Sequence, residues 1–106
     1  MKKVISILFL LPVICAGQWT QLGNSINGQA AGDSFGYSTA ISADGTIVAV
    51  GANSNDSNGN GSGQVRVFGL ANGIWSQIGG NLNGESGGDQ TGQSVSLSSD
   101  GSIVAI

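Results

Sequence analysis

The chain repeats itself after 56 residues. When the sequence is aligned with itself at that spacing, residues 19–50 match residues 75–106 without a gap, and 15 of the 32 aligned positions are identical. A fixed period of this size marks a solenoid, a propeller or an array, in which each unit buries its apolar surface against the next. The repeat therefore predicts a chain built of similar units packed against each other.

One period contains four short segments that favour β-strands, because each alternates apolar and polar residues or is rich in β-branched residues. They are Gly36–Ser42, Thr46–Ala52, Gly63–Leu70 and Ile74–Gly79. Asp-Gly separates the first two and Asn-Gly the last two, and both dipeptides favour tight hairpin turns. Four meandering strands per period predict one blade of a β-propeller, whereas a β-helix would need shorter coils. The predicted fold class is all-β, with four-stranded antiparallel meanders as propeller blades in an incomplete ring.

The same pattern divides the chain into four parts. Residues 1–17 are expected to be a signal peptide, 18–34 the outer strand of a ring-closing blade plus a linker, 35–79 a complete blade, and 80–106 the start of the next blade. Propellers commonly have about 4–8 blades, so we expect a fragment of a longer protein whose remaining blades complete the ring. A natural short form is the alternative, and it would need several chains to bury its strand edges.

The N-terminus has the features of a secretory signal peptide. Two lysines precede an apolar run from Val4 to Ala16, and small residues follow, which predicts cleavage near Gly17. The apolar run is short for a membrane span. Cys15 lies inside it, so the mature chain would have no thiol; a lipid anchor at Cys15 is the alternative, which the bulky Ile14 disfavours. We therefore expect a secreted or cell-surface protein with no membrane span in the mature chain.

Charge and residue types exclude several classes of function. After Lys2 and Lys3 leave with the signal peptide, Arg66 is the single basic residue against six acidic ones, which leaves a net charge of −5. Without a basic patch, we expect no binding to nucleic acid or to anionic membranes. The chain has no His, and no pair of carboxylates is spaced for general acid–base chemistry. We therefore predict no enzyme, with no catalytic and no cofactor-binding residues, and interpret Arg66 as a surface residue.

The residues that the two repeats share have a structural interpretation. Gly45 and Gly101 are expected to supply the positive φ of a hairpin turn, with Asp44 and Asp100 as turn residues beside them. Trp19 and Trp75 are expected on the outermost strand, packed between adjacent blades. The apolar strand next to the hub is expected to contain Ile47, Val48 and Val50 in the first repeat, and Ile103, Val104 and Ile106 in the second. Asp33 and Asp89 are interpreted as turn caps, with a rim-facing binding role as the alternative.

Three short motifs resemble the FG-GAP type of propeller repeat, which is found in integrin alpha-subunits and in secreted bacterial proteins, notably those of Bacteroidetes. Phe35-Gly36 matches the "FG", Gly51-Ala52 matches the start of "GAP" with Asn53 in place of proline, and Ser62–Phe68 matches the following strand. The second repeat departs from this motif, because it has Thr91-Gly92 at the "FG" position. The resemblance implies a propeller fold and says little about a ligand.

Calcium binding is a weak expectation. Integrin-like blades carry an Asp-x-Asp-x-Asp-Gly cluster between their first two strands, where this chain has a tight turn with one aspartate. The later loop, Asn53–Gly63, offers only weak candidate ligands: Asn55, Asp56, Asn58 and Asn60. Calcium prefers about 6–8 oxygen ligands, several of them carboxylates, and one carboxylate predicts poor affinity. We therefore expect no cofactor, with calcium as an alternative.

These observations favour a non-enzymatic role. We expect a secreted or cell-surface propeller segment for adhesion or for binding an extracellular protein or glycan, alongside the remaining blades of the same protein. Two alternatives stay open: an accessory propeller module of a larger extracellular enzyme, and a calcium-dependent adhesive repeat.

Overall fold

The computed structural model describes residues 17–106. The predicted signal peptide, apart from Gly17, lies outside these residues, so both the cleavage and the alternative lipid anchor at Cys15 stay predictions. Among residues 17–106, no helix is long and apolar enough to cross a membrane.

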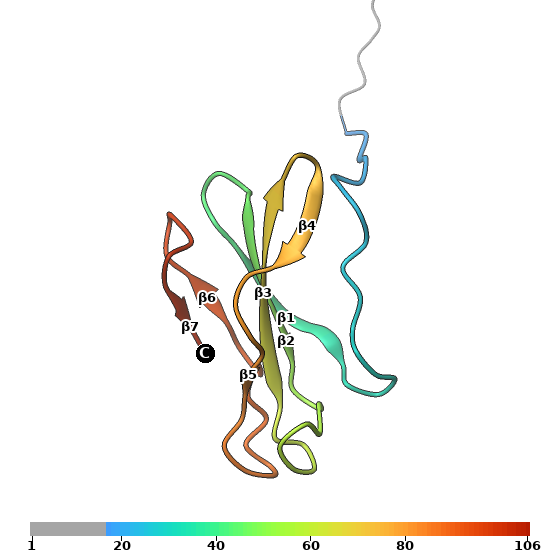
Figure 1. Ribbon diagram of the computed structural model, residues 1–106, viewed down its shortest axis with the longest axis vertical. Helices are drawn as coiled ribbons and strands as arrows, with labels where there is room; N and C mark the ends of the chain where they lie inside the picture. The colour runs from blue at the N-terminus through green and yellow to red at the C-terminus, as the bar shows by residue number, and fades with distance from the viewer. Residues whose placement is uncertain (1–16) are drawn as a thin grey trace, which may run out of the picture.

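The described chain is built of antiparallel strands (Figure 1). The main sheet has the order β1-β2-β3-β4, with the short β5 paired to β3 beyond the end of β4. The bounds of its strands are Phe35–Ile41 (β1), Ile47–Ala52 (β2), Gln64–Ala71 (β3), Ile74–Gln77 (β4) and Leu82–Asn83 (β5). A second hairpin joins Ser96–Leu97 (β6) to Val104–Ala105 (β7). The predicted all-β fold of four-stranded antiparallel meanders is confirmed, and it is that of a propeller blade.

A bulge gives the Phe-Gly motif a physical role. β1 pairs with β2 from Ile41 to Ser38, and the register then shifts before Phe35 pairs with Ala52. Gly36 lies in this bulge with a φ of 94°, and its equivalent Gly92 has a φ of 92°. Only glycine adopts such a φ without strain. The second repeat therefore keeps the glycine although it has lost the phenylalanine.

The core lies on β2 and β3, the two strands that have hydrogen-bonded neighbours on both sides. Its buried apolar residues are Ala49, Val50, Ala52, Val65 and Phe68. The Phe68 ring meets Phe35 edge-on, with 6.3 Å between the ring centroids. Such edge-to-face pairs stabilise beyond the area that they bury, so the phenylalanine of the Phe-Gly motif fixes the start of β1 against β3.

Arg66, interpreted from the sequence as a surface residue, is half-buried. Its guanidinium carbon lies 5.3 Å from the Phe35 ring centroid and 4.9 Å from that of Phe68. Arg66 Nη1 also donates to Asn27 O at 2.9 Å, and Nε donates to Gln77 Oε1 at 3.1 Å. The planar guanidinium thus binds the segment before β1 to both β3 and β4.

Arg66→Ala should therefore lower the free energy of unfolding by about 2 kcal/mol, because it removes two cation–π contacts and two hydrogen bonds. Arg66→Lys should recover only part of this loss, since an ammonium group cannot reproduce the planar fork. Urea unfolding followed by circular dichroism measures both changes. Equal stability of the alanine variant and the parent chain would show that the guanidinium contacts contribute nothing.

The segment before β1 differs from the expected outer strand. Within residues 18–34 no strand forms, and the Trp19 side chain is 95% exposed instead of packed between blades. A single strand cannot satisfy its own backbone groups without a neighbour. Trp75 lies on β4, where its indole Nε1 donates to Leu22 O at 2.8 Å and its backbone N donates to Asn24 Oδ1 at 2.7 Å. Its packing between adjacent blades stays a prediction.

Candidate functional site: the seam between the two repeats

Two hydrogen bonds join residues that are equivalent in the two repeats. Ala43 N donates to Ser99 O at 2.8 Å, and Gln93 Nε2 donates to Tyr37 OH at 3.3 Å, in each case across 56 positions. When two repeats are related by a rotation, a pair of equivalent residues can touch only if both residues lie close to the rotation axis. These bonds lie at the two ends of β1, so β1 is the strand nearest the axis of the predicted propeller.

Two glycines make a close backbone contact across the seam, the interface between the two repeats. Gly51 on β2 packs against the backbone of Gly92, where an added Cβ would overlap Gly92 O and the Ser38 hydroxyl. Ser38 Oγ donates to Gly92 O at 2.7 Å. The glycine of the "GAP" motif is therefore needed for backbone-to-backbone packing between repeats.

A chain of amides crosses the same seam. Asn53 Nδ2 donates to Gln93 Oε1 at 2.7 Å, and the Gln93 amide reaches Tyr37 from there. Asn53 Oδ1 is buried and has no hydrogen-bond partner among the described residues. Asn53 occupies the usual proline position of the motif, so its amide gives this seam a polar contact that proline could not make.

Backbone bonds fasten the β2–β3 loop to the second repeat at the opposite end of the blade from the β1–β2 turn. Gly84 N donates to Gly63 O, Gln90 N to Gly61 O, and Thr91 N to Ser62 O, each at 2.9 Å. The Asn58 amide adds bonds to Gly84 O at 2.8 Å and to Glu85 O at 3.1 Å. We call this set of bonds, between residues 58–63 and 84–91, the loop clasp.

The weak calcium candidates take part in hydrogen bonds within this region. Asn55 Oδ1 accepts from Ser57 N at 2.9 Å, and Asp56 Oδ1 accepts from Gly61 N at 2.7 Å. The Asn58 amide is part of the loop clasp, and Asn60 is exposed. Within residues 17–106, no three His, Cys, Asp or Glu side chains gather in a group that could hold a metal ion.

The recurring aspartates Asp33 and Asp89 have different roles. Asp89 Oδ2 accepts from Ser86 N at 3.1 Å, which is a turn-capping bond. Asp33 is buried, and its Oδ2 accepts from the buried Asn55 Nδ2 at 2.7 Å. Asp33 therefore ties the segment before β1 to the β2–β3 loop, and a turn cap describes only Asp89.

The hairpin turns of both repeats share one carboxylate arrangement. Asp44 Oδ1 accepts from the Thr46 hydroxyl at 2.8 Å, the Thr46 backbone N at 3.0 Å and the Ser42 hydroxyl at 2.9 Å. Asp100 accepts the same three hydrogen bonds from Ser102 and Ser98.

These hydrogen bonds lower the pKa of both carboxyl groups. The Thr46 hydroxyl is the largest cause that lowers the pKa of Asp44. The backbone N–H of Ser102 is the largest cause that lowers the pKa of Asp100 to about 2. Gly45 and Gly101 complete the turns with φ of 77° and 75°.

These lowered pKa values predict acid sensitivity. A folded-state pKa below the unfolded value adds stability that is present above about pH 4 and is lost as the pH falls toward about 2. Thermal unfolding between these limits should therefore show a falling Tm in the parent chain and a flatter curve in the double variant Asp44→Ala/Asp100→Ala. Glu85→Ala removes an exposed carboxylate and is the control, which should keep the parent slope. Parallel curves for all three chains would contradict the role of the two turns.

The seam joins opposite faces of the two repeats. We define the downstream face as Ser38, Ala40, Ile47 and Ala49 in the first repeat and as Ser94, Ser96, Ile103 and Ala105 in the second. We define the upstream face as Thr39, Ile41 and Val48 in the first repeat and as Val95, Leu97 and Val104 in the second. Neighbouring residues along a strand point to opposite faces, which separates the two sets. β6 lies against β1 and β2, and a Cβ on Gly101 would lie 2.7 Å from Ile47 Cγ1.

Burial follows this arrangement on the downstream face, where every first-repeat residue is half-buried or buried and every second-repeat residue is exposed. On the upstream face the order reverses only at the β1 positions: Thr39 and Ile41 are exposed, and their equivalents Val95 and Leu97 are half-buried. At the β2 positions it does not reverse, since Val48 and Val104 are both half-buried and Val50 is buried whereas Ile106 is exposed. The expected apolar strand is thus buried at Val50 in the first repeat, whereas in the second repeat Ile103 is 66% and Ile106 is 53% exposed among the described residues.

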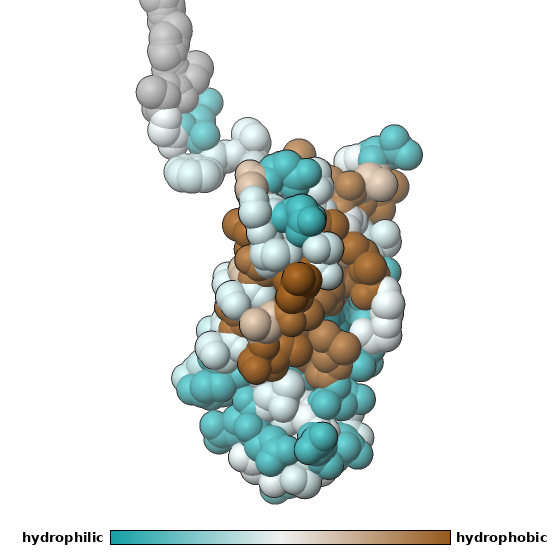
Figure 2. Space-filling view, turned by 90° about the vertical axis from the view of Figure 1, so that its left-hand side faces the viewer, coloured by the Kyte–Doolittle hydropathy of each residue, from teal (hydrophilic) through white to brown (hydrophobic). Residues whose placement is uncertain are grey.

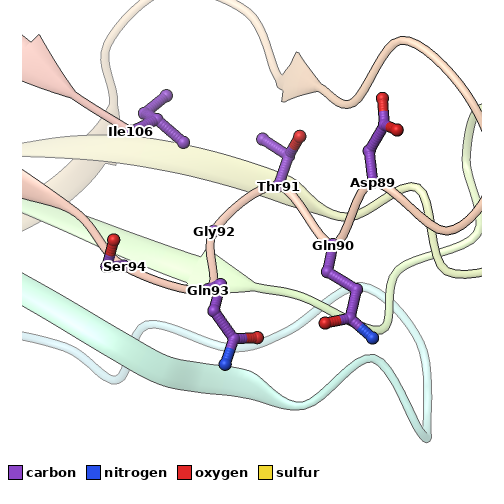
Figure 3. Close-up of a pocket in the computed structure, with 7 residues that line it drawn as sticks. All are labelled: Asp89, Gln90, Thr91, Gly92, Gln93, Ser94 and Ile106. Atoms are coloured by element: carbon purple, nitrogen blue, oxygen red, sulfur yellow. The ribbon is translucent and has the colours of Figure 1, made fainter.

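A pocket of about 220 Å³ opens beside the seam. Figure 3 shows Thr91 and Asp89 pointing to one side of the lining segment, and Gln90 and Gln93 pointing to the other, toward the first repeat. The lining residues are Asp89, Gln90, Thr91, Gly92, Gln93, Ser94 and Ile106. They offer amides, hydroxyls and one carboxylate, a set that suits hydrogen bonding more than catalysis.

The bulge glycine, the glycine contact and the strand that follows the β2–β3 loop lie in a stretch that is similar to a known repeat family. Residues 27–68 match the FG-GAP repeat. The match covers the whole path from the segment before β1 to the middle of β3, including the Phe-Gly and Gly-Ala motifs. No curated protein and no solved structure matches the chain. An FG-GAP repeat is a structural repeat of the β-propeller type, and the integrin-like resemblance is supported for this stretch.

Proposed function

We propose that this FG-GAP segment is a non-enzymatic, extracellular binding module whose partner is a protein or a glycan. It contributes blades to a β-propeller and reaches the cell surface or the medium through the N-terminal signal peptide. The remaining blades are further repeats of the same kind packed around the axis.

One observation carries this proposal: the loop end of the blade is polar, exposed and rigidly held. The loop clasp fixes the β2–β3 loop by backbone bonds, while Asn60 on this loop and Glu85 on the second-repeat segment that it contacts stay exposed. A surface that is ordered before binding loses little conformational entropy when a partner docks. Exposed amides and a carboxylate provide the directional hydrogen bonds that hydroxyl-rich glycans and polar protein surfaces require.

The experiment is a binding assay of the purified chain on immobilised neutral polysaccharides, anionic polysaccharides and glycoproteins. Asn60→Ala and Glu85→Ala should weaken whatever binding is found by about tenfold each, a typical loss for one well-placed contact. Asn72→Ala is the matched control, because it removes an exposed asparagine from the opposite end of the blade. Binding that all three substitutions leave unchanged would place the interaction elsewhere.

Two alternative functions are separated by other readouts. A calcium-dependent adhesive repeat should gain thermal stability in millimolar calcium, since a ligand that binds only the folded state raises Tm. An unchanged Tm would count against it. Hydrolytic activity that maps to these blades would overturn the non-enzymatic assignment, whereas activity from a separate domain would make this segment an accessory module.

A further inference from the structure

Five asparagines are followed directly by glycine, a sequence in which the asparagine side chain can lose ammonia without an enzyme. They are Asn27, Asn58, Asn60, Asn72 and Asn83, and all of them are exposed. The glycine favours the reaction because it has no side chain to obstruct its own backbone nitrogen. Local sequence and exposure are therefore the same at all five sites, and only their backbone contacts distinguish them.

The reaction closes a ring on the asparagine. The glycine backbone nitrogen bonds to asparagine Cγ, the bond from Cγ to the side-chain nitrogen breaks, and that nitrogen leaves as ammonia with the proton of the glycine N–H. Water then opens the succinimide ring at either carbonyl, which gives aspartate or isoaspartate. To reach Cγ, the peptide group between the two residues must rotate, so a hydrogen bond to its N–H or to its carbonyl oxygen opposes the reaction.

Two of the sites lie in the β2–β3 loop, at the end of the blade where hydrophilic residues gather (Figure 2). Asp56 restrains both of them. Its Oδ1 accepts from Gly61 N at 2.7 Å, and its backbone O accepts from Gly59 N at 3.2 Å. The nitrogens that would attack Asn60 and Asn58 are therefore already engaged in hydrogen bonds.

Contacts between distant segments restrain two further sites. Gly84 N donates to Gly63 O at 2.9 Å as part of the loop clasp, so the nitrogen that would attack Asn83 is engaged. At Asn27 the carbonyl oxygen of the same peptide group accepts from Arg66 Nη1 at 2.9 Å. Rotation of either peptide group would break its hydrogen bond.

Asn72 differs from these four sites. It lies with Gly73 in the turn between β3 and β4, at the opposite end of the blade from the loop clasp (Figure 1). Among residues 17–106, neither Asn72 O nor Gly73 N has a hydrogen-bond partner. Apart from its two chain neighbours, no atom lies within 4 Å of the place where a Cβ on Gly73 would be. The peptide group therefore has both the freedom and the room to rotate.

We propose that Asn72 is a site of spontaneous deamidation in the folded protein, and that the loop hydrogen bonds and Arg66 protect the other four sites. The product carries one more negative charge at an exposed turn. Where the ring opens to isoaspartate, the chain continues through the side-chain carbon, which lengthens the backbone of the short turn between Ala71 and Ile74. Loop length selects the turn type of a hairpin, so this product should loosen the pairing of β4 with β3. The modification does not depend on what the loop end binds.

Peptide mapping by mass spectrometry on the incubated, folded chain tests this assignment. In mildly alkaline buffer at physiological temperature, Asn72 should deamidate at least about tenfold faster than each of the other four, since these must first open locally. In concentrated urea the five rates should approach one another, because every glycine nitrogen is then free. Similar rates in the folded chain, or a faster rate at any other site, would overturn the proposal. So would rates that stay as different in urea, since local sequence would then set them.

Asp56→Ala tests the protection itself. The substitution removes the acceptor of Gly61 N, so deamidation at Asn60 should accelerate by about fivefold, the change expected for one hydrogen bond. The rate at Asn72 in the same molecule should stay unchanged. Glu85→Ala removes an exposed carboxylate of the second repeat and is the matched control, which should change neither rate. Circular dichroism checks that both variants are folded, and an unchanged rate at Asn60 in the folded Asp56 variant would contradict the protective role.

Discussion

A Gly63→Ala chain is expected to lose about 3 kcal/mol of unfolding free energy, a large share of the stability of a small domain. Gly63 has a φ of 81°, in the left-handed region that alanine enters only with strain. An added Cβ would also overlap the backbone of Thr91. Since Thr91 belongs to the loop clasp, the clash cannot be relieved by moving a side chain.

Gly80→Ala is the matched control for this substitution. No atom lies within 4 Å of the place where a Cβ on Gly80 would be, so alanine should be tolerated there. Thermal unfolding of the three chains gives the comparison. The Gly63 variant should melt more than about 10 °C below the parent chain, and the Gly80 variant within a few degrees of it. If both variants melt together, the closeness of the two backbones at the clasp does not limit stability.

Phe68→Ala should cost about 3–5 kcal/mol, the usual range for deleting a buried phenylalanine side chain. Phe68 is 5% exposed and contacts both the Phe35 ring and the Arg66 guanidinium. Its loss therefore opens a cavity and also removes one wall of the arginine site.

Phe68→Leu separates these two effects, because leucine fills much of the cavity but offers no ring to Arg66. The leucine variant should lie between the parent chain and the alanine variant in urea unfolding. Combining Phe68→Leu with Arg66→Ala should give a smaller loss than the sum of the single changes, since both remove the same cation–π contact. Strict additivity would contradict this coupling.

The strands and hairpins could be predicted from sequence because their signals are local. Asp44-Gly45 and Asn72-Gly73 lie at the turns that they predicted, and each of the four strands expected within residues 35–79 agrees with an observed one to within one or two residues. Periodicity and turn chemistry act over a few neighbouring residues, so a single repeat is enough to show them. The repeat then extends the pattern to the second hairpin.

The seam could not be predicted in the same way. The loop clasp is made of backbone groups separated by more than 20 residues, and such bonds leave no side-chain signature beyond scattered glycines. Arg66 looked like a surface residue because its strand alternates, although two aromatic rings and two acceptors hold it. Asp33 and Asp89 occupy equivalent positions, yet only Asp33 has Asn55 within reach. An aspartate at this position of the repeat therefore has a different role in each repeat, because different hydrogen-bond partners lie within reach of it.

The loop clasp also sets an order of events during folding. A chain is synthesised from its N-terminus, so β2, β3 and the loop between them are present before Thr91 is added. Until then the carbonyls of residues 60–63 have only water as partners, and the first blade stays open at its loop end. The loop of each repeat thus gains its last hydrogen bonds only when the following repeat folds. Folding should therefore proceed from the N-terminal repeat toward the C-terminal one. The Gly61 N–H donates to Asp56 Oδ1 within the loop, so its hydrogen exchange reports whether the loop is ordered. Exchange at Gly61, compared between the full chain and one truncated after Asn81, tests whether that order depends on the clasp; equal protection in both would exclude the dependence.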